Sequence, residues 1–384
     1  MTNSTGLESP LEAIIVGGSL AGLTAALAMA RIGIRVTVLD RGANHYVAGS
    51  GLWVDADALH DTIGAAYRGP SGTALGVDVA GGRQYALAWA QLHAWLRDLT
   101  AVAPQIKLRD GVIVRTVGQD RDTAWASDAE GRRYSGDLVI GADGYRSVTR
   151  RAVTGTESPS KFAGYVMWRG LLPEHDAQAA QGHSRLPHMT WEASRGSFVF
   201  AYPVPGTQRE TSKGDRQAAW GWYDNQHNAL LRVHGSISDT EVQHSLRGTE
   251  LTSAELGGLL TEAAQTWPRS WRSRVLAQMR ARNFIGTPIA EYEPEALARG
   301  RVVLVGDAAH LASPVSGMGF NQSLRDIRAL AAAFAPTGRG NPQVTMALSE
   351  YERLRLTEAR ALVRSGRLFS QEFGQSHRAA ESAA

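Results

Sequence analysis

Residues 12–40 hold the feature that most limits what this chain can fold into, a glycine-rich turn between an apolar strand and a helix. The apolar run AIIVGG is followed by the helix-forming LAGLTAALAMARIG and by a second apolar run, RVTVLD. Two such runs on either side of a helical segment predict a βαβ unit with parallel strands in a buried sheet. We therefore expect an α/β fold that begins with a Rossmann-like layer.

The turn, GGSLAG, places Gly17, Ser19 and Gly22 at the three positions of the GxGxxG dinucleotide-binding pattern. This pattern lets the backbone approach a pyrophosphate at the start of the helix, and Ser19 fits it only with a negative φ. Asp40 ends the next strand 23 residues after Gly17, where it can bond a ribose hydroxyl, and Arg41 follows as a phosphate partner. An ordinary βα turn is the alternative, but the combined spacing favours a dinucleotide.

Two later apolar runs also end in polar residues, since DLVIGADGYRSVTR and RVVLVGDAAH place Asp143 and Asp307 at strand ends. Ligands of parallel sheets bind at the edge formed by the carboxyl ends of the strands. We therefore expect Asp143 to contact phosphate or ribose, and Asp307 to contact a chain of hydroxyls. Beyond Asp307, Gly317 and Gly319 permit close contact with a flat ring. A helix starting near residues 320–321 is expected to point its positive end at that ring.

Residues 160–224 carry aromatic-rich strands without helices between them, which predicts an antiparallel sheet inserted into the nucleotide-binding layer. A long, arginine-rich closing helix is predicted over residues 343–371. The expected division is a flexible tail at 1–12, a discontinuous nucleotide-binding domain at 13–66, 86–158 and 289–384, a hairpin insertion at 67–85, and a sheet domain at 159–288.

The composition argues against several classes of protein. A chain of 384 residues is too long to fold around one small hydrophobic core. Its lack of cysteine rules out disulfides, thiolate metal sites and a cysteine nucleophile. A net charge of +3 with scattered arginines gives little support for nucleic-acid binding. No apolar run reaches the roughly 18 residues of a membrane helix, and the N-terminus does not resemble a signal peptide, so we expect a cytoplasmic protein.

The histidines predict no metal site. His183 and His188 have only each other at ligand spacing, and His45 is interpreted as a solvated loop residue. His310, in GDAAH, is interpreted as structural. No Ser-His-Asp arrangement is seen either, so no catalytic side chain is assigned.

Together, GGSLAG, DLVIGADGYRSVTR and GDAAHLASPVSGMGFNQSLRD resemble the three fingerprints of the class A flavoprotein monooxygenases, the aromatic hydroxylases with the para-hydroxybenzoate hydroxylase fold. LSEYERLRLTEARALVRSGRLF resembles the family's C-terminal helix, and GSGLW resembles its segment beneath the flavin. GYVMWRGLL and AYPVPG are most similar to the subgroup that hydroxylates N-heteroaromatics such as dihydroxypyridines and oxidised purines. The implied fold is a Rossmann-like FAD-binding domain of the GR2 type with an inserted antiparallel substrate domain and a long C-terminal helix.

The resemblance implies a single-component, FAD-dependent monooxygenase that consumes NADPH or NADH and O2. It would hydroxylate a small activated aromatic or N-heteroaromatic ring through a flavin C4a-hydroperoxide. The implied FAD contacts are Gly17, Ser19, Leu20, Ala21, Gly22, Asp40, Arg41, Asp143, Asp307, Pro314, Gly317, Gly319, Phe320 and Asn321. Trp89 stands where many relatives carry an Arg or Gln that touches the cofactor. The choice between a monomer and a homodimer is left open.

The substrate pocket is predicted at aromatic residues of the inserted sheet. Strand alternation puts Phe200 and Tyr202 on one face of one strand, and Trp220 and Trp222 on one face of the next. Such stripes are ordinarily core, but we expect these four, with Pro314, to line a cavity over the flavin. Neither face carries a charge to pair with a carboxylate, so an electron-rich ring with a hydroxyl or ring nitrogen is the expected substrate.

Three alternatives stay open at the level of sequence. They are a flavin oxidoreductase of the same fold that inserts no oxygen, a flavin-dependent halogenase, and a non-catalytic nucleotide-binding module. WGWYDN matches the start of the halogenase W-x-W-x-I-P signature at Trp220 and Trp222 but not its continuation.

Overall fold

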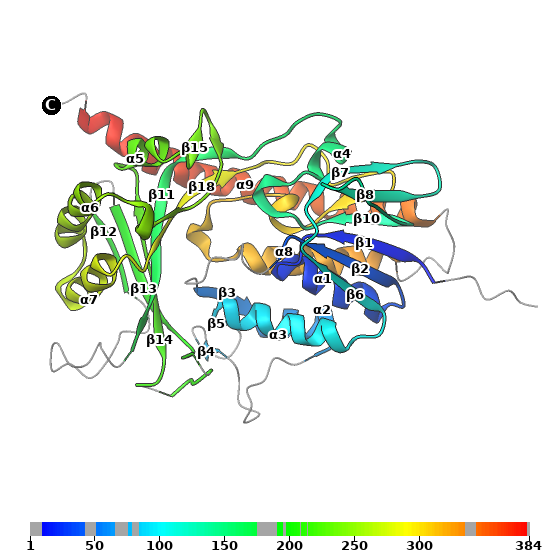
Figure 1. Cartoon of the computed structure of the whole chain (residues 1–384), viewed down its shortest axis with the longest axis horizontal. Coiled ribbons are helices and arrows are strands. Elements are labelled where there is room, and N and C mark those ends of the chain that lie inside the picture. The colour runs from blue at the N-terminus through cyan, green and yellow to red at the C-terminus, as the bar shows by residue number, and fades with distance from the viewer. Residues whose placement is uncertain are drawn as a thin grey trace, which may run out of the picture.

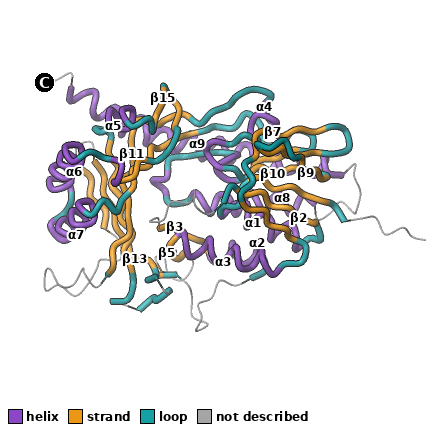
Figure 2. The backbone as a smooth tube through the Cα atoms, in the orientation of Figure 1, coloured by secondary structure: helices purple, strands orange, loops and turns teal. Residues whose placement is uncertain are grey.

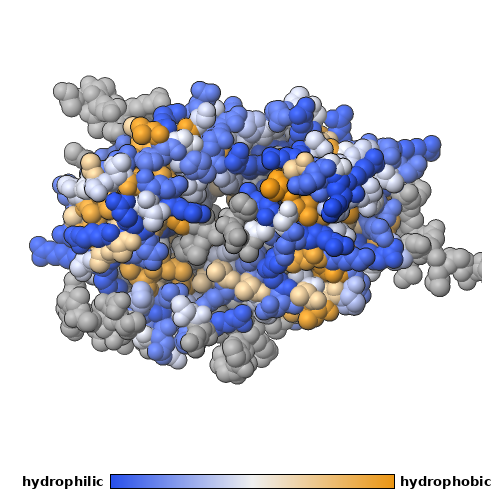
Figure 3. Space-filling model, in the orientation of Figure 1, coloured by the Kyte–Doolittle hydropathy of each residue, from blue (hydrophilic) through white to orange (hydrophobic). Residues whose placement is uncertain are grey.

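The structure, a computed structural model, describes residues 10–42, 51–65, 76–78, 84–174, 190–194, 197–207, 209–212, 214–334 and 343–381. It consists of two halves, each built around one large sheet, and the chain passes between them more than once (Figure 1). On the face drawn in Figure 3, hydrophilic residues predominate and apolar residues show only in small groups. Within the described residues, no helix combines the length and the apolar character needed to cross a bilayer.

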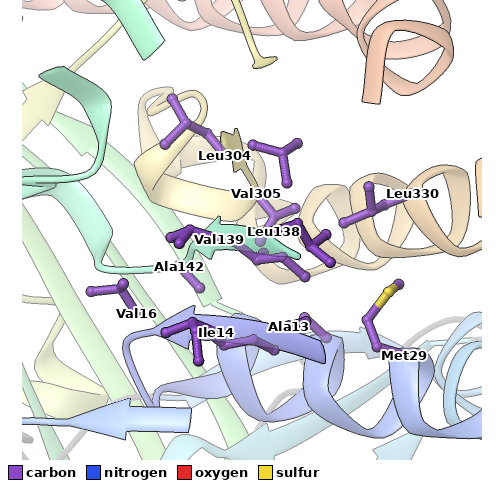
Figure 4. Packing of buried hydrophobic residues seen from close by; sticks show 14 of the residues in the cluster. Ala13, Ile14, Val16, Met29, Leu138, Val139, Ala142, Leu304, Val305 and Leu330 are labelled. Carbon is purple, nitrogen blue, oxygen red and sulfur yellow. The ribbon is translucent and has the colours of Figure 1, made fainter. Parts of the chain in front are cut away.

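The first half is a Rossmann-like sheet. Its strands lie in the order β19 (Ala298–Arg299), β20 (Val302–Leu304), β10 (Leu138–Gly141), β1 (Glu12–Val16), β2 (Arg35–Asp40) and β6 (Ile106–Asp110). All neighbours in this order pair in parallel except β19 with β20. Side chains of β1 and β10 pack against helices α1 (Leu20–Arg31) and α8 (Gly319–Phe334) in one apolar core (Figure 4). Strands buried on both faces are apolar along their whole length, which is why their sequences stand out.

The second half is an antiparallel sheet with helices on its outer face. Its long strands lie in the order β12 (Thr190–Ser194), β13 (Ser197–Val204), β14 (Gln217–Asp224) and β11 (Lys161–Pro173), and β18 (Ile285–Glu291) also pairs with β11. Its short elements are β15 (Ile237–Ser238), β16 (Glu241–Val242), β17 (Leu246–Arg247) and α5 (Asn228–Val233). Helices α6 (Ser253–Thr266) and α7 (Arg269–Arg280) cover the face turned away from the first half (Figure 1). The other face is therefore left to border the Rossmann half.

Two small sheets and three helices complete the first half. One sheet comprises β3 (Gly51–Asp55), β5 (Gln84–Ala88) and β4 (Val77–Asp78), and the other β7 (Val114–Gln119), β8 (Ala124–Asp128) and β9 (Arg133–Gly136). The helices are α2 (Ala56–Ile63), α3 (Trp89–Val102) and the short α4 (Arg150–Thr154). Strand β3 contacts α8, and β5 contacts β13, so the first small sheet bridges the two halves.

The C-terminal helix α9 (Gln343–Glu381) runs along both halves as one long helix (Figure 2). It packs on α8 and β19 in the first half and on β11 in the second. The Tyr351 hydroxyl donates to the Leu304 carbonyl at 2.8 Å, and Glu352 accepts from the amides of Leu297 and Ala298 at 2.6 and 2.8 Å. These bonds attach α9 to the edge of the Rossmann sheet.

The predicted fold class is confirmed: a Rossmann-like α/β layer, an inserted antiparallel sheet and a long C-terminal helix. Helix α8 begins at Gly319, just before the predicted start, and α9 continues beyond the predicted end at residue 371. The predicted domain limits stay a prediction. Of the predicted tail only residues 10–12 are described, and much of the predicted hairpin at 67–85 lies outside the described residues.

Candidate active site

The turn after β1 contains two glycines that a larger residue cannot replace without movement of the backbone. Gly17 has a φ of +104°, and a Cβ there would lie 2.4 Å from the Ala142 carbonyl oxygen. A Cβ at Gly22 would lie 1.8 Å from the Gly17 carbonyl oxygen. Ser19 keeps the negative φ that the sequence requires, −81°, and its side chain does not cap α1. The first-turn amides of α1 are thus left to a ligand, as in a pyrophosphate site.

A cavity of about 340 Å³ lies between this turn and the inner face of the second sheet. Its lining residues are Ser19, Leu20, Ala21, Gly51, Leu52, Trp53, Trp89, Ala142, Gly144, Met167, Phe200, Tyr202, Tyr223, Asp307, Pro314, Val315, Gly317, Gly319, Phe320 and Ser323. Segments far apart in the sequence therefore meet here: the start of α1, strand β3, the loop before α8 and the inserted sheet.

The geometry of this cavity fits FAD. A Cβ at Gly319 would meet no atom within 4 Å, so the backbone at the start of α8 borders open space. Gly317 has a φ of +65° and ends the short helix η6 (Pro314–Ser316), which Pro314 begins. The indole Nε1 of Trp53 is buried and has no hydrogen-bond partner among the described residues. A polar ring edge in the cavity would supply that partner.

Asp307 follows β20 and lines the cavity where a ribityl chain would pass. Burial raises the pKa of its carboxyl, although the charges of His310 and Arg150 act in the opposite direction. The Arg150 guanidinium donates to the carbonyls of Asp307 and Ala308 at 3.0 and 2.9 Å. Arg150 thus holds the backbone of the short helix η5 (Gly306–Ala308) in place.

Two predicted FAD residues make contacts within the protein. The Asp143 carboxylate accepts from the amides of Val148 and Thr149 at 2.8 and 3.0 Å, which braces the turn before α4. Asn321 is buried, and its Oδ1 accepts from the Asp55 amide at 2.9 Å, which holds β3 against α8. Both residues shape the site from beside the cavity.

The residues predicted for the adenosine end lie at the carboxyl end of β2, beyond this cavity. Asp40 is 1% exposed, and its carboxylate is 3.6 Å from Nη1 of Arg97. Arg41 is exposed. Trp89 forms part of the cavity wall and stacks on His93, with ring centroids 4.7 Å apart.

The second sheet contributes only part of the predicted aromatic pocket. Phe200 and Tyr202 line the cavity, whereas the placement predicted for Trp220 and Trp222 is wrong. Because Ala201 lies opposite Trp220 in the register of β13 and β14, the tryptophans share its face and not that of Phe200. They are 1% and 0% exposed in the core beneath α6 and α7. Alternation correctly predicts which residues of one strand share a face, but the register decides which faces of the two strands lie together.

Trp222→Phe should therefore lower stability rather than alter the cavity. The Trp222 indole donates to the Ser197 hydroxyl at 3.2 Å, and Ser197 is only 2% exposed. An unpaired buried hydroxyl costs about 1 to 3 kcal/mol, which denaturant unfolding of the wild type and variant would measure. Phe200→Leu, on the cavity face, is the matched comparison and should change ligand binding instead. A changed ligand affinity without loss of stability in Trp222→Phe would contradict this placement.

His310 belongs to a buried polar network at the base of the loop between β20 and α8, residues 305–318, which we name the cofactor loop. Its Nε2 is 2.7 Å from Asp326, whose carboxylate also accepts from Nε of Arg355 and from the Gly306 amide, both at 3.0 Å. Burial alone would lower the pKa of His310, but the neighbouring Asp326 raises this pKa above its usual value. Burial alone would raise the pKa of Asp326, but His310 and Arg355 lower this pKa below its usual value. The network places His310 in a structural role.

The pair of His310 and Asp326 should make stability depend on pH. Because the pKa of His310 is raised on folding, this group contributes to the free energy of unfolding fully below its ordinary pKa of 6.5, and the contribution is lost as pH rises through the folded-state pKa. Because the pKa of Asp326 is lowered on folding, its contribution to the free energy of unfolding is present above the ordinary pKa of 3.8 and is lost as pH falls through the folded-state pKa. Above pH 6.5, the free energy of unfolding should thus fall more steeply with rising pH for the wild type than for His310→Gln. Parallel curves would contradict the pairing.

The other histidines named from sequence, His45, His183 and His188, lie outside the described residues. In the part of the chain that the structure describes, no group of three or more His, Asp or Glu side chains is placed to hold a metal ion.

A second cavity, of about 280 Å³, adjoins the first across the cofactor loop. The two share Met167, Asp307, Pro314 and Gly319 as lining residues. The second is also lined by Arg169, which sequence reasoning did not include. Arg169 and Met167 alternate with the buried Trp168 on β11, a signal that needs the strand pairing before a face can be assigned.

Comparison with known proteins agrees with this geometry. The sequence profile of the FAD binding domain family matches residues 10–62 and 258–366, and that of an FAD binding domain-like family matches residues 162–250. The 2,6-dihydroxypyridine 3-monooxygenase of Paenarthrobacter nicotinovorans is 26% identical over 339 residues, which cover 83% of this chain and 82% of that protein. The 3-amino-4-hydroxybenzoate 2-monooxygenase of Streptomyces cremeus is 26% identical over 396 residues, with coverage of 96% and 89%.

Solved structures share the fold. Klebsiella pneumoniae HpxO, complexed with FAD and uric acid, superposes with a TM-score of 0.69 at 23% identity and covers 97% of this chain and 92% of its own. The 2,6-dihydroxypyridine-3-hydroxylase from Arthrobacter nicotinovorans gives a TM-score of 0.73 at 22% identity, with coverage of 96% and 93%.

The FAD binding domain profile and the shared fold define a flavoprotein with FAD as its cofactor. The chain is a single-component, FAD-dependent monooxygenase that is similar to the class A flavoprotein monooxygenases.

Proposed function

We propose that this enzyme uses NADPH or NADH and O2 to hydroxylate a small activated aromatic or N-heteroaromatic ring. The observation that carries the proposal is the aromatic wall of the first cavity, where Phe200, Tyr202 and Tyr223 face the cofactor loop at Pro314 and Gly317. When bound, FAD would accept a hydride from the nicotinamide and activate dioxygen. A flat apolar wall beside that ring suits an aromatic substrate.

The residues of the chain bind and orient the cofactor. The first turn of α1 would hold the pyrophosphate, and Asp307 would accept hydrogen bonds from the ribityl hydroxyls. Gly317 and Gly319 would let the backbone approach the ring closely, and the positive end of α8 would favour negative charge on it. Phe200, Tyr202 and Met167 keep water from the reacting centre.

The names of the relatives support a small ring as substrate. Those cited above act on a dihydroxypyridine and on an aminohydroxybenzoate, and HpxO is complexed with uric acid. A shared feature of these compounds is one activated ring or fused heterocycle of modest size. The first cavity, at about 340 Å³, is compatible with the flavin ring and part of such a substrate.

The halogenase alternative depends on Trp220 and Trp222, which lie behind the sheet and away from the cavity. The oxidoreductase alternative, without oxygen insertion, differs from our proposal in its products.

The test is NADPH and NADH oxidation by purified, FAD-loaded enzyme against phenols, hydroxypyridines, purines and quinones, with peroxide and product both measured. We expect at least one phenol or N-heteroaromatic to accelerate oxidation and to gain a hydroxyl, with little peroxide. Acceleration by quinones alone, or peroxide as the sole oxygen product with every ring, would contradict the proposal.

A further inference from the structure

A row of buried hydroxyls joins the cofactor loop to the C-terminal helix. The Tyr165 hydroxyl of β11 lies 2.7 Å from the Ser313 hydroxyl of the cofactor loop and 3.2 Å from the Ser370 hydroxyl of α9. The Ser370 hydroxyl donates in turn to the Glu291 carboxylate of β18 at 2.6 Å. All four residues are buried, with exposed fractions between 0% and 8%. The cofactor loop, the second sheet and α9 therefore meet at Tyr165.

The hydrogen bonds of this row run in one consistent direction, toward the carboxylate. The Ser370 hydroxyl is nearer to Glu291 than to the Gly366 carbonyl, at 2.6 against 3.3 Å, so its single hydrogen is directed to the carboxylate. Ser370 then accepts from Tyr165, and the Tyr165 oxygen accepts from Ser313. Burial raises the pKa of Tyr165 to about 12, so its phenol keeps the hydrogen that it donates at neutral pH.

The backbone of α9 also lies directly against the cofactor loop. A Cβ added at Gly366 would lie 2.9 Å from the Ser313 amide nitrogen, so a side chain at this position would push the two segments apart. Ser313 is followed by Pro314, which begins η6, and α9 contacts this short helix. Pro314 lines both cavities. A shift of α9 at Gly366 would therefore move the wall of the flavin site.

The ring of Tyr165 connects α9 to the aromatic wall. It packs edge-on against Tyr223, which lines the first cavity, with ring centroids 5.8 Å apart. Phe369 and Phe373 of α9 also pack edge-on against Tyr165, at centroid distances of 6.2 and 5.2 Å. Tyr165 is not among the described residues that line either cavity. It therefore acts on the flavin through its neighbours.

We propose that Tyr165 is a positioning residue for the flavin site, and that its hydroxyl fixes the cofactor loop against α9. The loop then presents Pro314 and Gly317 to the flavin ring in one arrangement and holds the start of α8 toward it. Hydrogen-bonded hydroxyls in a dry interior have few alternative partners, so such a row specifies one position of the segments that it joins. This role concerns the bound cofactor, so it is independent of which ring the enzyme hydroxylates.

The test compares the wild-type holoenzyme with Tyr165→Phe and Tyr351→Phe, without substrate or nicotinamide. Phenylalanine keeps each aromatic ring and removes only the hydroxyl. Tyr351 is also 0% exposed, but its hydroxyl donates to Leu304 of β20 and not to the cofactor loop. Both variants should lose stability, because each leaves a buried polar group without that partner. Thermal unfolding of the apoproteins measures this loss.

Only Tyr165→Phe should alter the flavin. We expect the FAD dissociation constant to rise about threefold to tenfold, as for one lost hydrogen bond, and the visible absorption bands of bound FAD to shift toward those of FAD in water. The midpoint potential of the bound flavin should fall, because a loosened loop holds the positive end of α8 less firmly toward the reduced ring. Tyr351→Phe should match the wild type in all three measurements.

Ser313→Ala tests whether Tyr165 acts through the cofactor loop. This variant alone should change FAD affinity and absorbance in the same direction as Tyr165→Phe. Adding Tyr165→Phe to it should then cause little further change, because the partner on the loop is already absent. Ser370→Ala removes the α9 end of the row and should give a smaller change of the same sign. It takes the place of Tyr165→Phe if that variant does not fold.

The proposal is overturned if Tyr165→Phe, or Ser370→Ala in its place, keeps the FAD affinity, absorption bands and midpoint potential of the wild type, since the role would then be structural alone. It is also overturned if the changes from Tyr165→Phe and Ser313→Ala add in the double variant. Because every measurement is made without substrate, an enzyme that hydroxylates no ring would refute the proposed function and leave these results unaffected.

Discussion

Asp326→Ala is expected to lower the free energy of unfolding by about 3 to 5 kcal/mol, the usual result of removing one partner from a buried ion pair. Asp326 is 0% exposed, and its carboxylate accepts from His310, Arg355 and the Gly306 amide. Its loss leaves the Arg355 guanidinium, with a side chain 5% exposed, in the protein interior without this carboxylate. Denaturant unfolding of the FAD-loaded protein measures the effect.

Asp61→Ala is the matched control. Asp61 and Arg328 also approach each other, at 3.8 Å, but their side chains are 57% and 49% exposed. Surface ion pairs contribute about 0 to 1 kcal/mol, so the control should stay near the wild type. Equal losses in the two variants would show that the interior network contributes no more than a surface contact.

Gly319→Leu is expected to yield a folded protein that binds FAD poorly. A side chain at Gly319 meets no described atom within 4 Å and projects from the start of α8 into the space shared by the two cavities. Forcing the flavin ring against this side chain should weaken FAD binding about tenfold or more, since overpacking costs about 1 to 3 kcal/mol. The melting temperature of the apoprotein should stay close to that of the wild type. FAD retained after gel filtration gives the binding result.

Gly257→Leu makes the same substitution at an exposed glycine of α6, where a Cβ also meets nothing within 4 Å. It should keep both FAD and stability. If Gly319→Leu retains FAD as well as this control does, the flavin ring does not lie where we place it.

The Rossmann half was predictable because its signals are local. Gly17 is required by its positive φ and Gly22 by its contact with the Gly17 carbonyl, and Ser19 meets its φ condition in the same turn. Asp307 and Gly319 follow a strand whose burial on both faces makes it recognisable in the sequence. These positions needed no knowledge of which strands pair.

The wall of the substrate site was only partly predictable because it depends on pairing between strands. A shift of one residue moves every side chain to the other face of a sheet, and this decides that Trp222 is core while Phe200 is wall. Arg169 reaches this wall from a third strand, β11, whose neighbours β14 and β18 come from distant segments. Asn321 and Asp143 illustrate a different limit, since a motif marks a position without showing which way its side chain turns.

The most direct test of the central claim is the origin of the oxygen in the product. Holoenzyme would be supplied with NADPH or NADH, with the aromatic ring that most accelerates its oxidation, and with isotopically labelled dioxygen in unlabelled water. We predict that mass spectrometry finds one labelled oxygen atom in the hydroxylated ring and that no product forms without dioxygen. Product carrying oxygen from water, or an altered ring formed under nitrogen, would contradict the assignment as a monooxygenase.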